Sequence, residues 1–208
     1  RAATTAARRT AMSGAGLVVL SRYMADELAA AGLPGAAVLP PWVEPGPPRT
    51  RAGDGVVLGG RLVAHKAPLD GWRAWRAAGS PQSLVVAGAG PLEARLEGAD
   101  RLGWLPARRL RAALRGARAL LFPARWQEPF GILGVEALAE GAPVIVADVG
   151  GTPDWSAAGC LRVPAGDADA MADAVRRIAA DPALALRLGR EGQAAVAERF
   201  TRAHLEPP

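Results

Sequence analysis

A loop that follows an apolar run at residues 55–59 combines two glycines with two cationic side chains. Residues 59–66 read Gly-Gly-Arg-Leu-Val-Ala-His-Lys. Glycine lets a backbone turn tightly and approach a ligand, while Arg61 offers a planar fork of donors and Lys66 a point charge, as a diphosphate requires. Lys66 is the only lysine among 25 basic residues. Its position favours a binding role over an ordinary loop with solvated basic side chains.

A second set of candidate residues lies at 123–144 and contains two carboxylates. A strand is predicted to end at Phe122 and a helix to begin near Gly131, with Glu128 before the helix and Glu136 inside it. The first turn of a helix leaves backbone N–H groups unpaired and carries partial positive charge, which suits phosphate or sugar hydroxyls. Carboxylates accept hydrogen bonds from hydroxyls. This segment therefore predicts contacts to a sugar or a ribose.

Two other interpretations of Glu128 and Glu136 stay open at this point. A glycosidase also uses paired carboxylates, but its pair normally stands on separate elements that flank the bond. The two residues can also be a helix-terminal charge and a solvated helix residue. Gly131, Gly134 and Gly141 weigh against that reading, because glycine inside a helix costs about 0.5–1 kcal/mol relative to alanine and a close backbone approach to a ligand would compensate.

These residues need elements that position them, and the apolar pattern predicts such elements. Strands are predicted at 55–59, 83–87, 100–103, 118–122, 143–147 and 160–163, and helices at about 68–78, 91–97, 107–116, 131–140, 167–180 and 182–199. Asp167 and Asp181 are predicted N-caps, with Pro182 at the first helical position. Continuous apolar strands alternating with helices indicate an α/β fold, a doubly wound parallel Rossmann-like sheet. Ligands of such sheets bind beyond the carboxyl ends of the strands, where both candidate sets lie.

A shorter unit is predicted upstream of this domain. Strands are expected at 17–20 and 36–39, with a helix at 22–31 between them that Ser21 caps and Gly32 ends. Residues 40–48, which follow, are rich in proline. Such a stretch cannot form regular structure and predicts a linker or domain boundary.

Composition limits the class of protein. Of 208 residues, 50% are apolar, which excludes a disordered tail. We expect no transmembrane helix, because no long uninterrupted apolar run occurs, and no signal peptide is visible. The net charge of +5 favours anionic partners. Cys160 is the only cysteine, so we expect no internal disulfide, a reducing compartment and a buried structural thiol.

Several segments together resemble glycosyltransferase family 4. Glu128-Pro-Phe-Gly, four further residues and Glu136-Ala-Leu-Ala resemble the family's signature, and residues 60–66 look like its phosphate-binding loop. Residues 88–91, 103–105 and 149–154 are similar to its second-strand turn, its third-strand turn and its Gly-Gly loop. The matches follow the family's order across about residues 55–200. The resemblance implies the C-terminal, donor-binding half of a retaining glycosyltransferase with the GT-B fold.

The resemblance also implies a role for each matched residue. Arg61 and Lys66 would neutralise the donor diphosphate as it leaves, Glu136 would hold the ribose, and Glu128 would hold the transferred sugar, which makes Arg61, Lys66 and Glu128 the catalytic set. The other implied donor contacts are Gly60, Trp104 and Leu105 near the base, and the backbone of Phe130, Gly131, Ile132 and Leu133. No metal and no cofactor is implied, since Arg and Lys take the metal's role. No cluster of residues has metal-ligand spacing.

The same resemblance divides the chain and names its partners. Residues 1–45 would be a remnant of an N-terminal acceptor domain, 46–54 a linker, 55–200 the nucleotide-sugar-binding domain and 201–208 a tail. The expected partners are a UDP-, GDP- or ADP-sugar and the N-terminal acceptor domain, with no nucleic acid. Alternatives are a nucleotide-sugar-binding module without catalysis, or another GT-B enzyme such as a sugar-nucleotide epimerase. We expect the chain alone to be inactive.

A few residues have two readings or depart from the family. Arg108, Arg111, Arg115 and Arg118 recur at helical spacing; we favour a solvated helix face over a contact with anionic lipid or nucleic acid. We expect a cytoplasmic protein. If the basic face does meet anionic lipid, the alternative is peripheral contact with the inner face of a membrane. His65 is expected to be an ordinary loop histidine rather than a general base. The departures from the family are Ala67 for a frequent glycine, Ala89 for an acidic residue and Ala124 for a serine.

Overall fold

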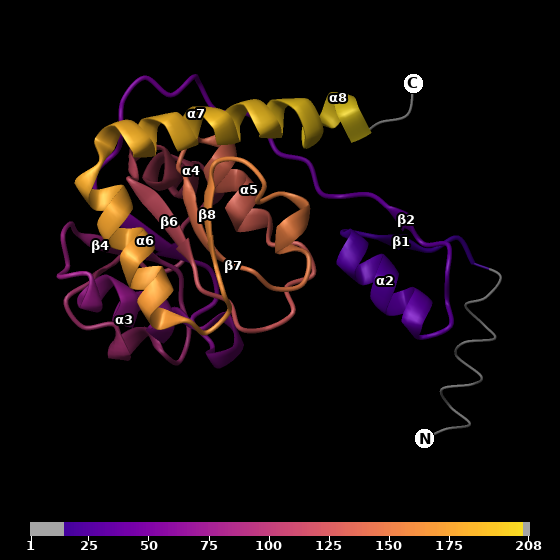
Figure 1. Cartoon of the computed structure of the whole chain (residues 1–208), viewed down its shortest axis with the longest axis horizontal. Coiled ribbons are helices and arrows are strands. Elements are labelled where there is room, and N and C mark those ends of the chain that lie inside the picture. The colour runs from indigo at the N-terminus through magenta and orange to yellow at the C-terminus, as the bar shows by residue number, and fades with distance from the viewer. Residues whose placement is uncertain (1–14, 206–208) are drawn as a thin grey trace.

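A parallel β-sheet lies at the centre of the molecule (Figure 1). In this computed structural model, which describes residues 15–205, the sheet has six strands in the order β5-β4-β3-β6-β7-β8, and every neighbouring pair is parallel. The strands are β3 (Val56–Gly59), β4 (Leu84–Ala87), β5 (Asp100–Arg101), β6 (Ala119–Phe122), β7 (Val144–Ala147) and β8 (Cys160–Val163). The predicted doubly wound α/β fold is confirmed.

Helices cover both faces of this sheet. The helix α3 (Pro68–Ala77) packs beside α6 (Ala168–Ala180) on one face, and α5 (Ile132–Ala139) packs between α4 (Ala107–Gly116) and α7 (Pro182–Arg199) on the other (Figure 1). Alternate strand residues enter the two cores: Val57 and Leu120 face α4, α5 and α7, while Leu58 and Leu121 face α3 and α6. Both faces are therefore buried, which explains why the strands read as continuous apolar runs.

The predicted helix caps are present. The side chain of Asp167 accepts a hydrogen bond from the N–H of Ala170, and Asp181 accepts one from Leu184 with Pro182 in the first turn. Ser21 likewise caps α2 (Arg22–Ala30) through the N–H of Met24. Each cap satisfies a backbone donor that the first turn leaves unpaired.

The helix predicted at 91–97 is wrong. The structure has only a 3-10 turn there, η2 (Glu93–Arg95), and β5 is likewise shorter than the predicted strand. Gly90 and Gly98 bracket the segment with φ angles of +156° and +74°. The few residues between them are too short a run for a stable α-helix, whose first turn is costly to nucleate.

The upstream unit stands apart from the main sheet. Among the described residues, β1 (Val18–Val19) and β2 (Ala37–Val38) form a parallel two-stranded sheet next to α2, to the right of the main sheet in Figure 1. The proline-rich stretch after β2 has no regular structure, as predicted, but it is fastened to the main domain. The N–H of Val43 donates to Phe200 O at 2.8 Å and that of Gly46 to Ala139 O at 2.9 Å.

Shorter elements complete the described chain: η1 (Ala64–Lys66), η3 (Thr152–Asp154) and α8 (Arg202–Leu205). α8 lies in the predicted tail. Residues 1–14 of the predicted N-terminal remnant and 206–208 of the tail lie outside the described residues. Within residues 15–205, no helix combines the length and the apolar character needed to span a bilayer.

Candidate functional site

The two candidate loops meet where the strand order reverses direction. From β3 the chain moves outward through β4 to β5, and from β6 it moves the other way through β7 to β8. β3 and β6 are neighbours, with Leu58 opposite Leu121. Such a reversal leaves a crevice at the carboxyl ends of the strands. Arg61 and Lys66 follow β3 and Glu128 follows β6, so all three border this crevice.

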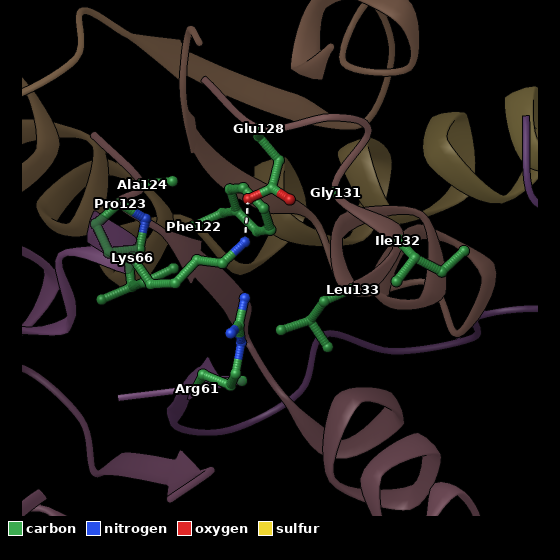
Figure 2. Close-up of a pocket in the computed structure, with 12 residues that line it drawn as sticks. Arg61, Lys66, Phe122, Pro123, Ala124, Glu128, Gly131, Ile132 and Leu133 are labelled. Atoms are coloured by element: carbon green, nitrogen blue, oxygen red, sulfur yellow. Dashed lines mark hydrogen bonds and ion pairs between the residues drawn. The ribbon is translucent and has the colours of Figure 1, made fainter. Parts of the chain in front are cut away.

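A first cavity lies between these loops and the start of α5. Arg61, Lys66 and Glu128 line it together with Gly131, and Figure 2 shows the charged ends of Arg61 and Lys66 reaching into the same space. The other lining residues are Gly59, Gly60, Leu121, Phe122, Pro123, Ala124, Ile132 and Leu133. The cavity thus has cations on one side and a helix N-terminus, with its partial positive charge, on the other.

Lys66 and Glu128 form an ion pair inside this cavity. The Lys66 Nζ donates a hydrogen bond to Glu128 Oε2 (Figure 2). The Glu128 side chain is only 9% exposed, and a carboxylate that is nearly buried needs a charged or hydrogen-bonding partner. Sequence reasoning placed the two residues at one edge of the sheet but did not anticipate that they contact each other.

A second cavity continues from the first toward Glu136. It shares Arg61 and Lys66 with the first, and its far wall carries Trp104, Leu105 and Glu136. The other residues that line it are Gly60, Ala87, Ala107, Leu110, Ile132 and Leu133. The cations therefore lie between one carboxylate in the first cavity and another in the second. This arrangement fits an elongated ligand with an anionic centre and hydroxyl groups on both sides.

The environment of Glu136 disfavours its charged form. Burial raises the pKa of this carboxyl above its ordinary value, and the nearby Arg111 guanidinium partly opposes the shift. A cavity carboxyl whose pKa is shifted by burial is a candidate functional residue, because packing alone would favour an apolar side chain.

The Gly-Gly loop at 149–154 holds the backbone that carries Glu128. The Gly151 N–H donates to Glu128 O at 2.7 Å, and the Gly150 N–H donates to the Gln127 side chain at 2.9 Å. A Cβ on Gly150 would lie 2.4 Å from Glu128 O, so a side chain would displace the loop. Sequence reasoning missed the part played by Gln127; the adjacent glycines were the available signal.

The loops after β3 and β6 are also joined through His65. Its carbonyl accepts hydrogen bonds from the N–H groups of Arg125 and Trp126, each at 3.2 Å, and its exposed ring meets the Trp126 ring edge to face at 5.8 Å. These contacts fit the expected loop histidine. Two residues after His65, Ala67 has a φ of +50°, a left-handed conformation that glycine adopts more readily than alanine.

Trp155 is a buried residue that sequence reasoning missed. Its indole N–H donates to Phe130 O at 2.5 Å. A Cβ added to Gly134 would lie only 2.2 Å from the Trp155 ring. Gly134 is therefore required by Trp155, and the predicted close approach to a ligand is wrong as its explanation. The predicted close approach to a ligand is also wrong for Gly141. This residue follows α5 with a φ of +77° and packs against Arg49.

The candidate donor contacts beside Trp155 are divided between cavity and core. Gly131 lines the first cavity, whereas Ile132 and Leu133 line both. Phe130 is not among the described residues that line these cavities. It is 2% exposed, its ring packs on Phe200 at 5.8 Å, and its carbonyl is used by Trp155.

The predicted solvated basic face is only partly correct. Arg108 is exposed, but Arg111 and Arg115 both pair with Glu140, which is 2% exposed at the end of α5. Arg118 lies beyond α4 and is buried, with its Nε donating to Gly53 O at 2.7 Å. Arg111 and Arg115 thus fasten α4 to the end of α5, and Arg118 fastens the segment after α4 to Gly53. A buried carboxylate or carbonyl needs such a donor.

Cys160 begins β8 and is partly buried against the core. Burial raises the pKa of its thiol to about 12, so the reactive thiolate is scarce at neutral pH. Within the described part of the chain, no group of His, Cys, Asp and Glu side chains is arranged to hold a metal ion.

Comparison with known families and proteins gives a consistent result. Residues 54–181 match the model of the family described as Glycosyl transferases group 1. An alpha-maltose-1-phosphate synthase of Mycolicibacterium smegmatis is 34% identical over 109 residues, which cover 49% of this chain and 28% of that protein. A D-inositol 3-phosphate glycosyltransferase of Streptomyces bingchenggensis is 42% identical over 88 residues, covering 41% and 19%. The matches thus span less than a third of the length of these curated relatives.

Solved structures share the fold. Sucrose-phosphate synthase from Thermosynechococcus elongatus superposes with a TM-score of 0.73 at 25% identity, covering 90% of this chain and 55% of that one. Anabaena HepE, solved in complex with UDP and glucose, gives a TM-score of 0.80 at 17% identity and covers 95% and 63%.

Proposed function

Because the chain belongs to the Glycosyl transferases group 1 family, we propose that it is the donor-binding half of a retaining glycosyltransferase of family 4. The observation that carries this proposal is the position of Arg61 and Lys66 between Glu128 and Glu136 in two adjoining cavities. A nucleoside diphosphate sugar has the same order of groups, with a diphosphate between a ribose and a sugar.

The ligand would lie across both cavities. The diphosphate would meet Arg61, Lys66 and the N-terminus of α5, where helix N–H groups favour an anion. The ribose hydroxyls would donate to Glu136 and the sugar hydroxyls to Glu128. HepE, which has the same fold, was solved with UDP and glucose, and this supports a UDP-sugar as one donor to test beside GDP- and ADP-sugars.

The same residues would assist the chemical step. When the bond between the sugar and the diphosphate breaks, negative charge develops on the leaving diphosphate. Arg61 and Lys66 would stabilise that charge in a preorganised site, so the step would need no metal and no cofactor. Glu128 would orient the sugar, and its ion pair with Lys66 would hold the Glu128 carboxylate in place.

The acceptor would be held by a domain to which the β1–α2–β2 unit belongs. This unit exposes large apolar side chains, with Val18 62% and Leu39 47% exposed, as expected where further polypeptide packs. An ion pair joins this unit to the donor half. It is formed by Arg22 of α2 and Asp154 of the Gly-Gly loop. We expect the present chain to bind a donor but not to transfer its sugar.

Substitution of the two cations tests the proposal. Lys66→Ala and Arg61→Ala should each weaken binding of UDP, GDP or ADP by about 1.5–3 kcal/mol, the scale of a charge-assisted hydrogen bond. Calorimetry on the purified chain measures this. Arg187→Ala is a matched control, because Arg187 lies on the exposed surface of α7 and pairs with Glu191. Unchanged affinity in both site variants would contradict the proposal and show that residues 59–66 form an ordinary loop with solvated basic side chains.

A further inference from the structure

Trp104 is a large apolar side chain that the fold leaves unburied inside a cavity. It is 67% exposed, more than any other large hydrophobic residue that the structure describes in residues 15–205. It lines the second cavity together with Glu136. Burying an aromatic side chain contributes substantially to stability, so this exposure indicates that the indole is available to a ligand rather than committed to the core.

The turn that carries Trp104 is fixed at both ends. The Leu102 N–H donates to Val86 O at 2.9 Å, which holds the turn to β4. On the other side, Pro106 O accepts hydrogen bonds from Arg109 and Leu110 at the start of α4. A side chain presented from such an anchored turn can form a binding surface at a low entropic cost.

The wall around Trp104 is apolar. Leu105, Ala107, Leu110 and Ala87 line this end of the cavity, whereas Arg61, Lys66 and Glu136 are its charged lining residues. Under the proposed function those three residues are occupied by the diphosphate and the ribose. The side chains left to meet the base are Trp104 and its apolar neighbours, which offer mainly stacking and apolar contact and, as a polar group, the indole N–H of Trp104.

We propose that Trp104 stacks on the nucleobase of the donor and that the chain selects nucleotides by stacking area, so that it accepts several bases and binds purine nucleotides more tightly than pyrimidine nucleotides. This inference rests on the proposed function. Stacking on an aromatic side chain tolerates base identity, because every base has a π-face. A site that hydrogen-bonds a ligand group, by contrast, rejects analogues without that group by large factors.

The test measures calorimetric affinity for ADP, GDP, UDP and CDP, with inorganic pyrophosphate as a ligand that has no base. All four nucleotides should bind, ADP and GDP within a few-fold of each other and both tighter than UDP and CDP. Trp104→Ala should weaken ADP and GDP by roughly five- to hundredfold, the range found for base–aromatic stacking. It should also narrow the spread among the nucleotides and leave pyrophosphate unchanged, while Trp104→Phe should retain most of the wild-type affinity.

Leu102→Ala is the matched control, because Leu102 is 50% exposed on the same turn and is not among the described residues that line this cavity. It should leave all affinities unchanged. Nucleotide binding that Trp104→Ala does not alter would overturn the inference and leave the proposed function standing. A preference of a hundredfold or more between ADP and GDP would also overturn it, since stacking cannot separate two purines so strongly. A folded chain that binds none of the nucleotides overturns both proposals.

Discussion

The Lys66–Glu128 ion pair joins two residues whose proposed ligands are different parts of the donor. Its presence means that a change at Glu128 also alters the environment of the Lys66 ammonium. The two glutamates should still differ in a measurable way. Glu136 would contact the ribose, which every nucleotide ligand carries. Of the parts of the donor, Glu128 would contact only the transferred sugar.

Glutamine substitutions should separate these roles. Glu136→Gln should weaken the bare nucleoside diphosphate and the sugar nucleotide by a similar factor. Glu128→Gln should not weaken the bare diphosphate, because it removes a carboxylate next to Lys66, but should weaken the sugar nucleotide by about 1–1.5 kcal/mol, or roughly tenfold. Calorimetry with matched ligand pairs measures both. If Glu128→Gln weakens bare UDP or GDP as much as Glu136→Gln does, the division of roles is wrong.

Glu136 also predicts a pH-dependent stability. Burial raises its pKa, so the folded state binds a proton more readily than the unfolded state, and the free energy of unfolding falls as the pH rises above the ordinary glutamate pKa of about 4.3. Glu136→Gln removes this cost. The variant should be more stable than the wild type at about pH 7, and the gain should vanish near about pH 3.5, where the wild-type carboxyl is protonated in both states.

Urea unfolding at both pH values tests this, with Glu198→Gln on the exposed surface of α7 as the control. The control should change stability by less than about 0.5 kcal/mol at either pH. A loss of stability in Glu136→Gln at neutral pH would show that the Glu136 carboxylate is held by favourable contacts instead.

At the scale of elements, the position of α5 depends on Trp155. The ring of Trp155 occupies the space beside Gly134, and its N–H fixes the carbonyl just before the helix. The start of α5, which lines both cavities, is thus aligned by a residue that is not among the described residues lining either cavity.

Gly134→Ala should therefore destabilise the protein by about 1–3 kcal/mol, the usual cost of overpacking a core, although alanine favours a helix by up to about 1 kcal/mol. Gly116→Ala in α4 is the matched control, because a Cβ there meets nothing within 4 Å; it should be neutral or stabilising. The free energies of unfolding in urea give both values. Equal effects of the two substitutions would contradict the proposed packing role of Gly134.

The elements that could be predicted from sequence are those that local patterns specify. Strands such as β6 and β7 are continuous apolar runs, and Asp167 and Asp181 cap helices through contacts three residues away. The reasons for Gly134 and for the Gly150–Glu128 contact could not be predicted, because they depend on residues far apart in the chain. Likewise, the candidate site residues could be found one by one, but the ion pair and the order of groups across the two cavities required the structure.

On the scale of the whole molecule, the parallel sheet brings together residues that lie far apart in the sequence. The reversal between β3 and β6 creates the crevice. The loop after β3 supplies the cations, the loop after β6 supplies Glu128, and the turn after β5 supplies Trp104. The helices of both faces hold these loop ends in place. We propose that this crevice binds a nucleoside diphosphate.

Calorimetric titration of UDP, GDP and ADP into the folded wild-type chain tests that claim most directly. We predict that at least one of them binds with one site per chain, and that the heat is lost or strongly reduced in Lys66→Ala. A chain that is folded by circular dichroism yet gives no heat of binding with any of the three nucleotides would contradict the assignment of a donor-binding half.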